Sequence, residues 1–550
     1  MFERIEKTAA DNVTHIMIKK PNGVSFSIKP FRSEKIKTEY NREGFEKITS
    51  TGYDMRYRFS ADIPGVYTVC EMNTDKAVSE YELEAVSGNK HGYVRVSHQN
   101  KRYFAYSDGE TFLPVGINMA FPKQYQLSNG KEFGLDGKYA YLGLRQYEAW
   151  IKKASRAGVN LIRIWCGHDY FTPEKTDNEV FLYEQFSKLD RIFELAHMYN
   201  VKIKLTIDQF RYFKYDDNGG YIDELFGKSL YDGSKKCTDA NEWLTDVRWQ
   251  KQWLKKTEEY AKRYAYDDAL FAVELWNEMN CFGCWWEEYN PNITEWNRVI
   301  SAKVKSLFPN HMVVNSIGSY DSDYSKKYYD EFCWDCFDFK QVHSYLDQGA
   351  KFKEATDNPI EIFKRVSKEL TNGSQPLFIA ETGAVNDNHS GPFRYYSADD
   401  DGLIFADCVY VPFFLGCVGC GNIWHWDDRY VEFKNLYHMY KPFVTLTEGI
   451  NTSKEMFRTE DFSDECTYIL VLSGRFHDLY YIRNKSASWQ NVLRDNGEIN
   501  IIDEIKLKIN GKAELIHIWQ DGERIEQSGD TAVVHNLQKG VFVRVSRGDN

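Results

Sequence analysis

The amino-acid sequence predicts an α/β fold, a (β/α)8 barrel flanked by an N-terminal and a C-terminal β-sandwich. Between about residues 110 and 450, eight apolar strand-like runs alternate with helix-like stretches, which is the pattern of a parallel barrel. Both ends of the chain hold short strands separated by Gly, Pro and Asn turns. No glycine-rich phosphate loop follows the first barrel strand, which disfavours a doubly wound sheet, the second choice.

Three domains account for the length of the chain. Its 550 residues exceed what one hydrophobic core ordinarily supports. We expect an N-terminal sandwich in residues 1–95, the barrel in residues 96–452 and a C-terminal sandwich in residues 453–550. The N-terminal strands are predicted at "THIMIKK", "GVSFSIKP", "YDMRYRFS" and "GVYTVCEM", and the C-terminal strands at "CTYILVLSG", "DLYYIRN", "IKLKING", "AELIHIWQ" and "GVFVRVSR".

The barrel elements follow from the spacing of apolar residues. Short apolar runs predict strands, and apolar residues at helical spacing predict helices. The strands are expected at residues 112–118, 161–166, 202–208, 271–278, 312–317, 337–345, 376–381 and 422–426. The helices are expected at residues 146–158, 180–200, 295–308 and 359–370, and a more apolar, more buried one at residues 403–416.

Composition and charge limit the classes of partner. The net charge of −12 argues against nucleic acid, whose phosphates need a basic footprint. The aromatic fraction of 16% leans slightly toward carbohydrate binding, because the C–H face of a sugar packs on aromatic rings. Residues 1–20 carry early charges and no apolar segment typical of a signal peptide, and no run approaches the length of a membrane span. We therefore expect a cytoplasmic protein without a membrane partner; the sandwiches could support a homo-oligomer.

Eleven cysteines include three pairs with the spacing Cys-x-x-Cys. Such pairs can bind zinc. The pair Cys281/Cys284 follows a predicted strand, whereas Cys333/Cys336 precedes one, so the two pairs are expected at opposite ends of the barrel. Free thiols are the preferred interpretation for these and for Cys417/Cys420, and neither a metal nor a cofactor is expected.

Polar residues stand at the ends of the predicted barrel strands. The fourth strand ends in "WNE", with Asn277 and Glu278, and the seventh ends in Glu381. Barrel enzymes carry their reacting groups at the carboxyl ends of the strands, so both carboxyl groups are expected at the mouth. The other candidates on the strands are Asn118, Arg163, His343, Tyr345, Trp424 and Trp426.

Two facing carboxyl groups suit the cleavage of a glycosidic bond. One must be protonated to assist the leaving oxygen, and the other must be ionised to attack the anomeric carbon. A neighbouring Arg favours the ionised form and a Tyr hydroxyl can donate to it, so Arg163 and Tyr345 are expected beside Glu381. Glu278 lacks that support and would stay protonated more readily.

The "WNE" of strand four and the "ETG" of strand seven, about 100 residues apart, resemble the clan A glycoside hydrolases, especially glycoside hydrolase family 5 and its relatives. The resemblance covers roughly residues 110–445. It implies that Glu278 is the acid/base, that Glu381 is the nucleophile and that Asn277 contacts the sugar 2-hydroxyl. By the same resemblance, Arg163 supports the nucleophile, His343 and Tyr345 form the strand-six pair, and Trp424 or Trp426 floors the sugar subsite.

One departure and two weaker candidates complete the predicted site. The family pattern has a histidine on strand three, where this sequence offers Asp208 and Gln209, which puts the exact family in question but not the clan. His168, after strand two, and Trp285, after strand four, are also expected to touch the substrate.

The sequence thus predicts a retaining hydrolase of β-linked glycosides. A carboxyl separation of about 5 Å would give retention of anomeric configuration. Long loops at about 209–242 and 279–294 would wall off one end of the cleft and favour exo action on a short oligosaccharide or small glycoside. Three alternatives stay open: a transglycosidase using the same two Glu, a non-catalytic carbohydrate-binding barrel, and a zinc protein organised by the cysteine pairs.

Overall fold

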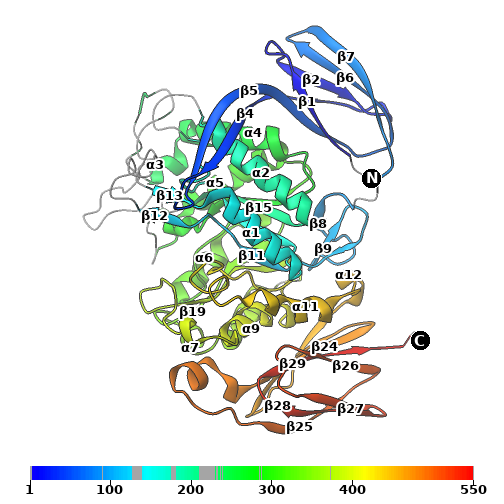
Figure 1. Ribbon diagram of the computed structural model, residues 1–550, viewed down its shortest axis with the longest axis vertical. Coiled ribbons are helices and arrows are strands. Elements are labelled where there is room, and N and C mark those ends of the chain that lie inside the picture. The colour runs from blue at the N-terminus through cyan, green and yellow to red at the C-terminus, as the bar shows by residue number, and fades with distance from the viewer. Residues whose placement is uncertain are drawn as a thin grey trace.

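The computed structural model places three bodies of secondary structure in a row (Figure 1). Antiparallel strands of the N-terminal part lie at one end, a mixed α/β body lies in the middle, and a second set of antiparallel strands lies at the other end. The structure describes residues 3–88, 91–126, 139–174, 181–209, 230, 233–235, 237, 240–283, 285, 288–371 and 373–548.

Parallel strands form the centre of the middle body. A five-stranded sheet has the order β11 (Gly116–Asn118), β14 (Leu161–Trp165), β15 (Lys202–Gln209), β16 (Leu270–Asn277) and β17 (Met312–Val314). A further parallel pair joins β18 (Lys340–His343) to β20 (Leu377–Glu381). Ile423 makes parallel bridges to Ile117 and to Thr382, so it connects the first strand to the strand that ends in Glu381.

Six of the eight expected strands are shorter in the structure, whereas β15 runs one residue further than expected and β16 keeps its length but begins and ends one residue earlier. The eighth, at residues 422–426, is reduced to the bridges of Ile423, because the chain turns beyond it and the N–H of Trp426 donates to the carbonyl of Trp424. The first begins at Gly116 rather than 112, because Pro114 lacks an N–H for the ladder. The strands β17 and β18 are not paired with each other. Their segments are linked by a hydrogen bond from the backbone N–H of Asp338 to the carbonyl of Val313, over 3.1 Å.

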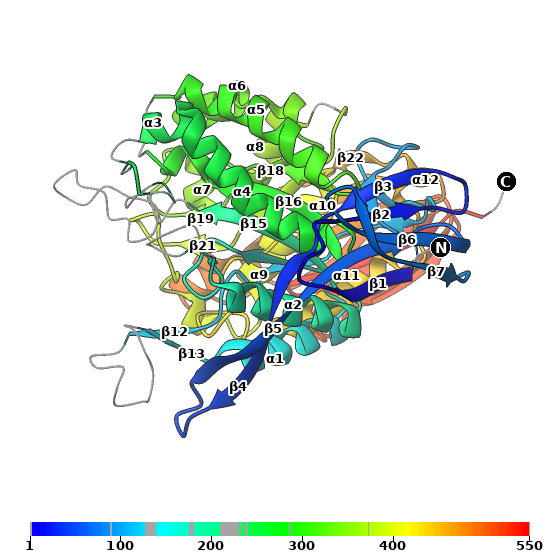
Figure 2. The same ribbon diagram turned by 90° about the horizontal axis from the view of Figure 1, so that it is seen from above.

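Helices cover the outer side of these strands (Figure 2). They begin at recognisable caps: the side chains of Asp246, Asn290 and Asn358 accept hydrogen bonds from the first turns of their helices. The predicted helix at 403–416 is two helices, since Pro412 cannot donate to the preceding turn. The main helices are α1 (Gly143–Arg156), α2 (Tyr183–Tyr199), α4 (Val247–Tyr264), α5 (Pro291–Leu307), α6 (Asp323–Glu331), α8 (Pro359–Leu370), α9 (Leu403–Val409), α10 (Val411–Phe414) and α11 (Tyr440–Thr447).

Two antiparallel sheets make up the N-terminal part. One has the order β1 (Glu3–Ala9), β5 (Glu46–Ala61) and β4 (Phe31–Tyr40); the other has the order β3 (Ser25–Ile28), β2 (His15–Lys19), β6 (Gly65–Asn73) and β7 (Lys76–Ala85). Their facing side chains share a small core that includes Ile16, Ile18, Tyr57, Phe59 and Val69. The two sheets therefore fold as one layered unit.

The hairpin of β4 and β5 extends far beyond this unit and lies along the helices of the middle body (Figure 1). The hydroxyl of Ser187 on α2 donates to the carbonyl of Glu34 over 2.9 Å. At the hairpin tip, the carboxylate of Glu46 accepts from the N–H of Leu144 and from the hydroxyl of Tyr170, both at 2.6 Å. Gly143 allows this approach, because a Cβ there would lie 2.0 Å from a Glu46 oxygen.

A small sheet closes the other end of the parallel strands. It contains β8 (Val94–Val96), β9 (Phe104–Tyr106) and β10 (Thr111–Phe112). The ring of Phe104 packs edge-on against Phe271, near the start of β16, and against Phe339, the residue before β18. The predicted domain boundary at residues 95/96 therefore falls inside a strand that belongs to the middle body.

The C-terminal part again has two antiparallel sheets. The larger has the order β22 (Arg458–Asp461), β23 (Thr467–Ser473), β24 (His477–Asn484), β29 (Gly540–Ser546) and β26 (Lys512–His517); the smaller has the order β25 (Ile502–Lys508), β28 (Thr531–Leu537) and β27 (Arg524–Ser528). Tyr481 and Phe542 of the larger sheet pack against Phe414 of α10, which joins this part to the middle body.

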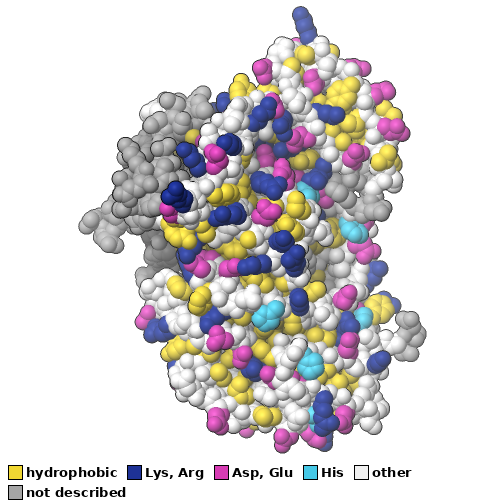
Figure 3. All heavy atoms as spheres, in the orientation of Figure 1, with side chains coloured by type: hydrophobic (Ala, Val, Ile, Leu, Met, Phe, Trp, Pro, Cys, Tyr) yellow, Lys and Arg dark blue, Asp and Glu magenta, His cyan; other side chains and the backbone are white. Residues whose placement is uncertain are grey.

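The visible surface mixes both signs of charge. On the face in Figure 3, Lys and Arg side chains alternate with Asp and Glu over all three parts of the molecule, with no broad basic area. Among the described residues, no helix is both long enough and apolar enough to cross a bilayer.

Three completely buried histidines predict a pH-dependent stability. Burial lowers the pKa of His311 and of His343 to about 4 and that of His425 to about 3. Because the unfolded chain then binds more protons than the folded one, stability is present above pH 6.5 and is lost as the pH falls toward 4. Each histidine is expected to contribute up to about 1.4 kcal/mol per pH unit in this window.

The measurement is the midpoint of urea unfolding between pH 4 and pH 7. In His425→Gln the free energy of unfolding should change less steeply with pH than in the wild type, because the unfolded variant binds one proton fewer. His98→Gln, at an exposed position, is the matched control and should leave the slope unchanged. Equal slopes in wild type and His425→Gln would contradict the prediction.

Candidate active site

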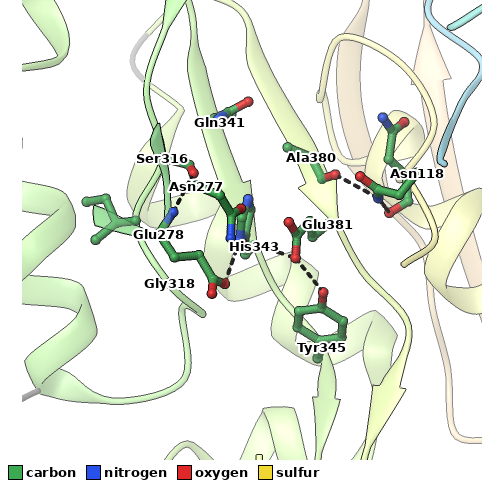
Figure 4. A network of polar contacts seen from close by, with 12 residues as sticks. Asn118, Asn277, Glu278, Ser316, Gly318, Gln341, His343, Tyr345, Ala380 and Glu381 are labelled. Carbon is green, nitrogen blue, oxygen red and sulfur yellow. Dashed lines mark hydrogen bonds and ion pairs between the residues drawn. The ribbon is translucent and has the colours of Figure 1, made fainter. Parts of the chain in front are cut away.

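The two predicted carboxyl groups come together at the carboxyl ends of the parallel strands. Figure 4 shows Glu278 and Glu381 turned toward His343 from opposite sides. One ligand atom of each of these three residues lies within 4.8 Å of the others, so the separation of the carboxyl oxygens is close to the predicted one. Glu278 has a left-handed backbone with φ of 53°, a strained conformation that costs about 1–2 kcal/mol in a residue with a Cβ.

Glu381 is nearly buried and is held by two donors. Arg163 donates from Nη1 to Oε1, and the hydroxyl of Tyr345 donates to Oε2 over 2.7 Å. Burial raises the pKa of Tyr345 well above its usual range, and the charge of Glu381 raises it further, so this hydroxyl stays protonated and donates. Arg163 and Tyr345 thus lie beside Glu381, as the sequence predicted.

Arg163 is completely buried and all of its donors are engaged. Nε and Nη2 donate to the two oxygens of Glu274 at 2.6 and 2.7 Å, and Nη2 also donates to Oδ1 of Asn277 at 2.6 Å. Burial alone would lower the pKa of Arg163, but the charges of Glu274 and Glu381 raise it, so the guanidinium keeps its charge. Arg163 therefore acts on the site by binding Glu381, and it is not placed to contact a substrate itself.

Glu278 is the more exposed of the two carboxyl groups and has different partners. Its N–H donates to the hydroxyl of Ser316 over 2.9 Å, and its Oε1 lies 2.8 Å from Nδ1 of His343. Burial lowers the pKa of His343 to about 4, although the charge of Glu381 raises it. The imidazole is therefore neutral above about pH 5 and offers Glu278 a hydrogen bond rather than a full positive charge.

Two polar atoms of the site have no hydrogen-bond partner among the described residues. They are Nδ2 of Asn277 and Nε2 of His343, both buried. Because Arg163 can only donate, the oxygen of the Asn277 amide must face it, which leaves the amide nitrogen free to donate elsewhere. An unpaired buried polar atom is costly, so these two atoms mark positions where a bound polar molecule would be stabilised.

Asn118 is a correction to the predicted set of substrate contacts. Its Nδ2 lies within hydrogen-bond distance of the carbonyls of Ala380, Asn422 and Ile423, and its Oδ1 accepts from Arg163 over 3.3 Å. Both ends of the amide are thus used inside the barrel. Asn118 ties the first strand to the last two instead of facing the mouth.

The two tryptophans of the eighth position have different surroundings. Trp424 packs against Trp165, with ring centroids 4.8 Å apart, and its backbone N–H donates to the carbonyl of Thr382, next to Glu381. Trp426 packs edge-on against Trp150 of α1 and lies behind Trp424. Trp424 is therefore the one placed beside the carboxyl groups.

His168 and Trp285 lie farther out on the loops. His168 stacks on Phe121 with ring centroids 4.3 Å apart and lines a cleft of about 670 Å³ together with Asp427 and Asp428. Trp285 packs edge-on against Phe282 on the loop that follows Glu278. Most of the predicted loop at 209–242, and residues 284, 286 and 287 of the loop at 279–294, lie outside the described residues.

The sequence prediction missed a buried polar layer beneath the site. Glu274 accepts from Arg163, from Thr206 and from Gln341, and Lys204 lies beside it. The signal was present in the sequence, because a single charged residue inside an otherwise apolar strand must find a partner within the core. Asp208 stands on strand three, where the family pattern has a histidine. Its carboxylate accepts hydrogen bonds from Trp253 and Lys256 of α4, so its role is structural.

Metal-binding geometry is limited to a few groups. Among the described residues, the groups of potential ligands close enough to share an ion are Glu278/His343/Glu381, His197/Asp267/Asp268 and Asp321/Asp347/His389, and none contains a cysteine. The described cysteines are free thiols; Cys284 lies outside the described residues. The first group is the two-carboxyl site itself, in which Nδ1 of His343 lies 2.8 Å from Oε1 of Glu278 and 3.5 Å from Oε2 of Glu381.

Two carboxyl groups less than 5 Å apart at the mouth of parallel strands, one of them contacted by an Arg and a Tyr, are the arrangement of a glycoside hydrolase. The chain belongs to glycosyl hydrolase family 5: the family model described as Cellulase (glycosyl hydrolase family 5) matches residues 127–404. This range contains both carboxyl groups, and membership of the family implies a (β/α)8 barrel.

Individual relatives agree with this assignment. The mannan endo-1,4-beta-mannosidase F of Aspergillus clavatus is 26% identical over 319 residues, which are 51% of this chain and 67% of that protein. The mannan endo-1,4-beta-mannosidase A of Hypocrea jecorina is 25% identical over 213 residues, 34% of this chain and 44% of that one. The chain thus spans about two thirds of the first relative and less than half of the second.

Solved structures share the fold at low sequence identity. A glycoside hydrolase family 5 from Bacteroides vulgatus ATCC 8482 superposes with a TM-score of 0.51 at 12% identity, covering 83% of this chain and 94% of that one. Another protein of the same organism has a TM-score of 0.54 at 12% identity and covers 100% of this chain and 98% of its own. The second likeness extends beyond the barrel to the whole chain.

Proposed function

We propose that this protein is a retaining glycoside hydrolase that cleaves a β-linked mannoside at the barrel mouth. The observation that carries the proposal is the pair Glu278 and Glu381, with oxygens within 4.8 Å of each other. Carboxyl groups about 5–5.5 Å apart perform double displacement, whereas inverting enzymes need a wider gap to admit water. The names of the relatives support mannose as the sugar.

In the first step Glu381 attacks the anomeric carbon. The Oε1 and Oε2 contacts from Arg163 and Tyr345 keep this carboxylate ionised and fix its orientation. Glu278 protonates the leaving glycosidic oxygen while the glycosyl–Glu381 ester forms. In the second step Glu278 takes a proton from water, the water oxygen attacks the anomeric carbon from the face opposite to Glu381, and the bond between that carbon and the Glu381 oxygen breaks, so the configuration is retained overall.

The unpaired amide nitrogen of Asn277 suggests where the sugar is held. Nδ2 of Asn277 would donate to the 2-hydroxyl, a contact that strengthens as the transition state forms. The indole face of Trp424 would support the sugar ring, because its C–H face packs well on an aromatic surface. His168 and Trp285 are proposed to line the adjacent subsites.

The finer architecture is also proposed. The parallel strands, with Ile423 as their eighth member, are proposed to form the (β/α)8 barrel, and the two pairs of antiparallel sheets its flanking β-sandwiches. Exo action stays a prediction, because the long loop that suggested it lies mostly outside the described residues. The cleft of about 670 Å³ beside His168 has the size of a ligand pocket and would admit further sugar units.

The proposal is tested with a panel of aryl β- and α-glycosides followed by β-1,4-mannooligosaccharides. Cleavage of the aryl β-mannoside, with the β-anomer as the first product seen by NMR, is expected. Release of mannose alone from the oligosaccharides would support exo action, and a mixture of shorter oligosaccharides would support endo action. An α-anomeric first product would contradict the retaining mechanism, and turnover of another sugar only would exclude mannose.

A further inference from the structure

A lysine is buried in the barrel beneath the proposed catalytic carboxyl groups. Lys204 lies on β15, and its side chain is completely shielded from solvent. Strand pairing places it directly beside Arg163 of β14, so two cationic residues are neighbours inside the ring of strands. Buried cations are costly unless anions and hydrogen bonds compensate them, so this pair demands a partner.

Glu274 is the shared partner of both cations. It takes two hydrogen bonds from Arg163, and its Oε2 lies 3.6 Å from Nζ of Lys204. Gln341 connects the same two groups: Nζ of Lys204 donates to its Oε1 over 2.7 Å, and its Nε2 donates to Glu274 over 2.6 Å. Because an ammonium can only donate, Lys204 fixes which end of the Gln341 amide faces Glu274.

Four charges therefore alternate in sign from the mouth inward: Glu381, Arg163, Glu274 and Lys204. Arg163 is divided between two carboxylates. When Lys204 carries its charge, its positive potential offsets the negative potential of Glu274, so the net potential at Glu381 is more positive. When Lys204 is neutral, the negative potential of Glu274 is not offset, and the ionised form of Glu381 is less stabilised.

We propose that Lys204 is a positioning residue of the active site, whose ammonium group acts through Glu274 and Arg163 to keep Glu381 ionised for attack. The inference rests on the proposed function, in which Glu381 is the nucleophile. Lys204 itself does not reach the substrate, because Glu274 and Gln341 lie around its Nζ inside the barrel.

The charge of Lys204 depends on pH in a useful range. Burial lowers its pKa to about 7, while the charges of Glu274 and Glu381 raise it and that of Arg163 lowers it. The ammonium is thus present in slightly acidic solution and is lost as the pH rises through neutrality. The charged and polar groups around it, strand by strand, are Arg163 on β14, Thr206 on β15, Glu274 on β16, Gln341 and His343 on β18, and Glu381 with the Phe378 ring on β20.

The test is the pH profile of kcat/KM for Lys204→Met on the aryl β-glycoside that the wild type cleaves. The acid limb reports the ionisation of the nucleophile in the free enzyme. Without the ammonium this limb should move upward by about 0.5–1 pH unit, and kcat below neutral pH should fall about tenfold with little change in KM. Above about pH 7, where the wild-type lysine is also neutral, the two profiles should converge.

Lys202→Met is the matched control on the same strand. Nζ of Lys202 donates to the carbonyl of Asp268, away from the carboxyl groups, so its profile should coincide with that of the wild type. Gln341→Met is the second variant: it leaves Lys204 in place but removes the amide bridge, and it should move the limb in the same direction by less. It keeps the proposal testable if Lys204→Met does not fold.

The outcomes separate the two proposals. Suppose that the wild type turns over the glycoside and that kcat/KM of Lys204→Met and of Gln341→Met is lowered by the same factor at every pH. This result would support the proposed function and overturn the role of Lys204. Such a uniform loss is what a purely structural lysine would give. A wild type without turnover on any β-glycoside would overturn both.

Discussion

Replacing the nucleophile is expected to have the largest effect: Glu381→Gln should lower kcat by about four orders of magnitude. The amide has nearly the shape of the carboxylate but cannot attack the anomeric carbon. Arg163 keeps its two hydrogen bonds to Glu274, so the barrel should remain folded. The measurement is kcat on the aryl β-glycoside, with far-UV circular dichroism and the melting temperature as checks of folding.

Glu369 provides a matched control, because it also has an Arg and a Tyr as partners but lies on α8, outside the site. It accepts from Arg365 over 3.1 Å and from the hydroxyl of Tyr320. Glu369→Gln should leave kcat unchanged within about twofold, since surface changes rarely act at a distance. Wild-type activity in Glu381→Gln would show that another group attacks the sugar.

Replacing the acid/base should give an effect that depends on the leaving group. In Glu278→Gln, kcat for a glycoside with a poor leaving group is expected to fall by about 10²–10⁴-fold, because that group needs protonation. For a dinitrophenyl glycoside the first step should proceed nearly as in the wild type. The second step should be slow, because no base activates water, so the glycosyl–enzyme should accumulate and appear as a burst of dinitrophenol.

Azide distinguishes the two carboxyl roles. In Glu278→Gln it should accelerate turnover and give the β-glycosyl azide, because it attacks the glycosyl–enzyme from the face that water uses. In Glu381→Gln it can replace only the nucleophile and should give the α-glycosyl azide. Reversal of these two products would exchange the roles of Glu278 and Glu381, and equal loss on both leaving groups would refute Glu278 as the general acid.

The sequence predicted the site well where a polar residue ends an apolar run. Glu278, Glu381 and Tyr345 could be placed together, because the ends of parallel strands converge on one mouth. Asn118 was misplaced for the same reason: a polar residue at a strand end can also turn inward and satisfy carbonyls of neighbouring strands. Which of these happens depends on packing between strands that are distant in sequence.

Other features depend on contacts that no local pattern encodes. Apolar periodicity predicted the helices at 295–308 and 359–370 closely, but it could not show that the eighth strand shrinks to Ile423. The buried polar layer is built from three strands, by Lys204, Glu274 and Gln341. In the sequence, only the isolated charges in "KIKLTID" and "FAVELWN" indicated it. A rule that pairs every lone charge of a buried strand would have found it.

The long β4–β5 hairpin bears on how the protein can be divided and inherited. Removing residues 1–95 would delete Glu46. The Tyr170 hydroxyl would lose its hydrogen-bond acceptor, and the nearby Lys188, whose pKa burial lowers to about 8, would lose the negative charge that stabilises its ammonium form. A chain that began at that point would keep a buried donor without an acceptor, and it would expose the surface that the hairpin covers. We therefore expect the N-terminal strands and the middle body to unfold together, and an exchange of this module between relatives to require the hairpin together with the residues that it contacts.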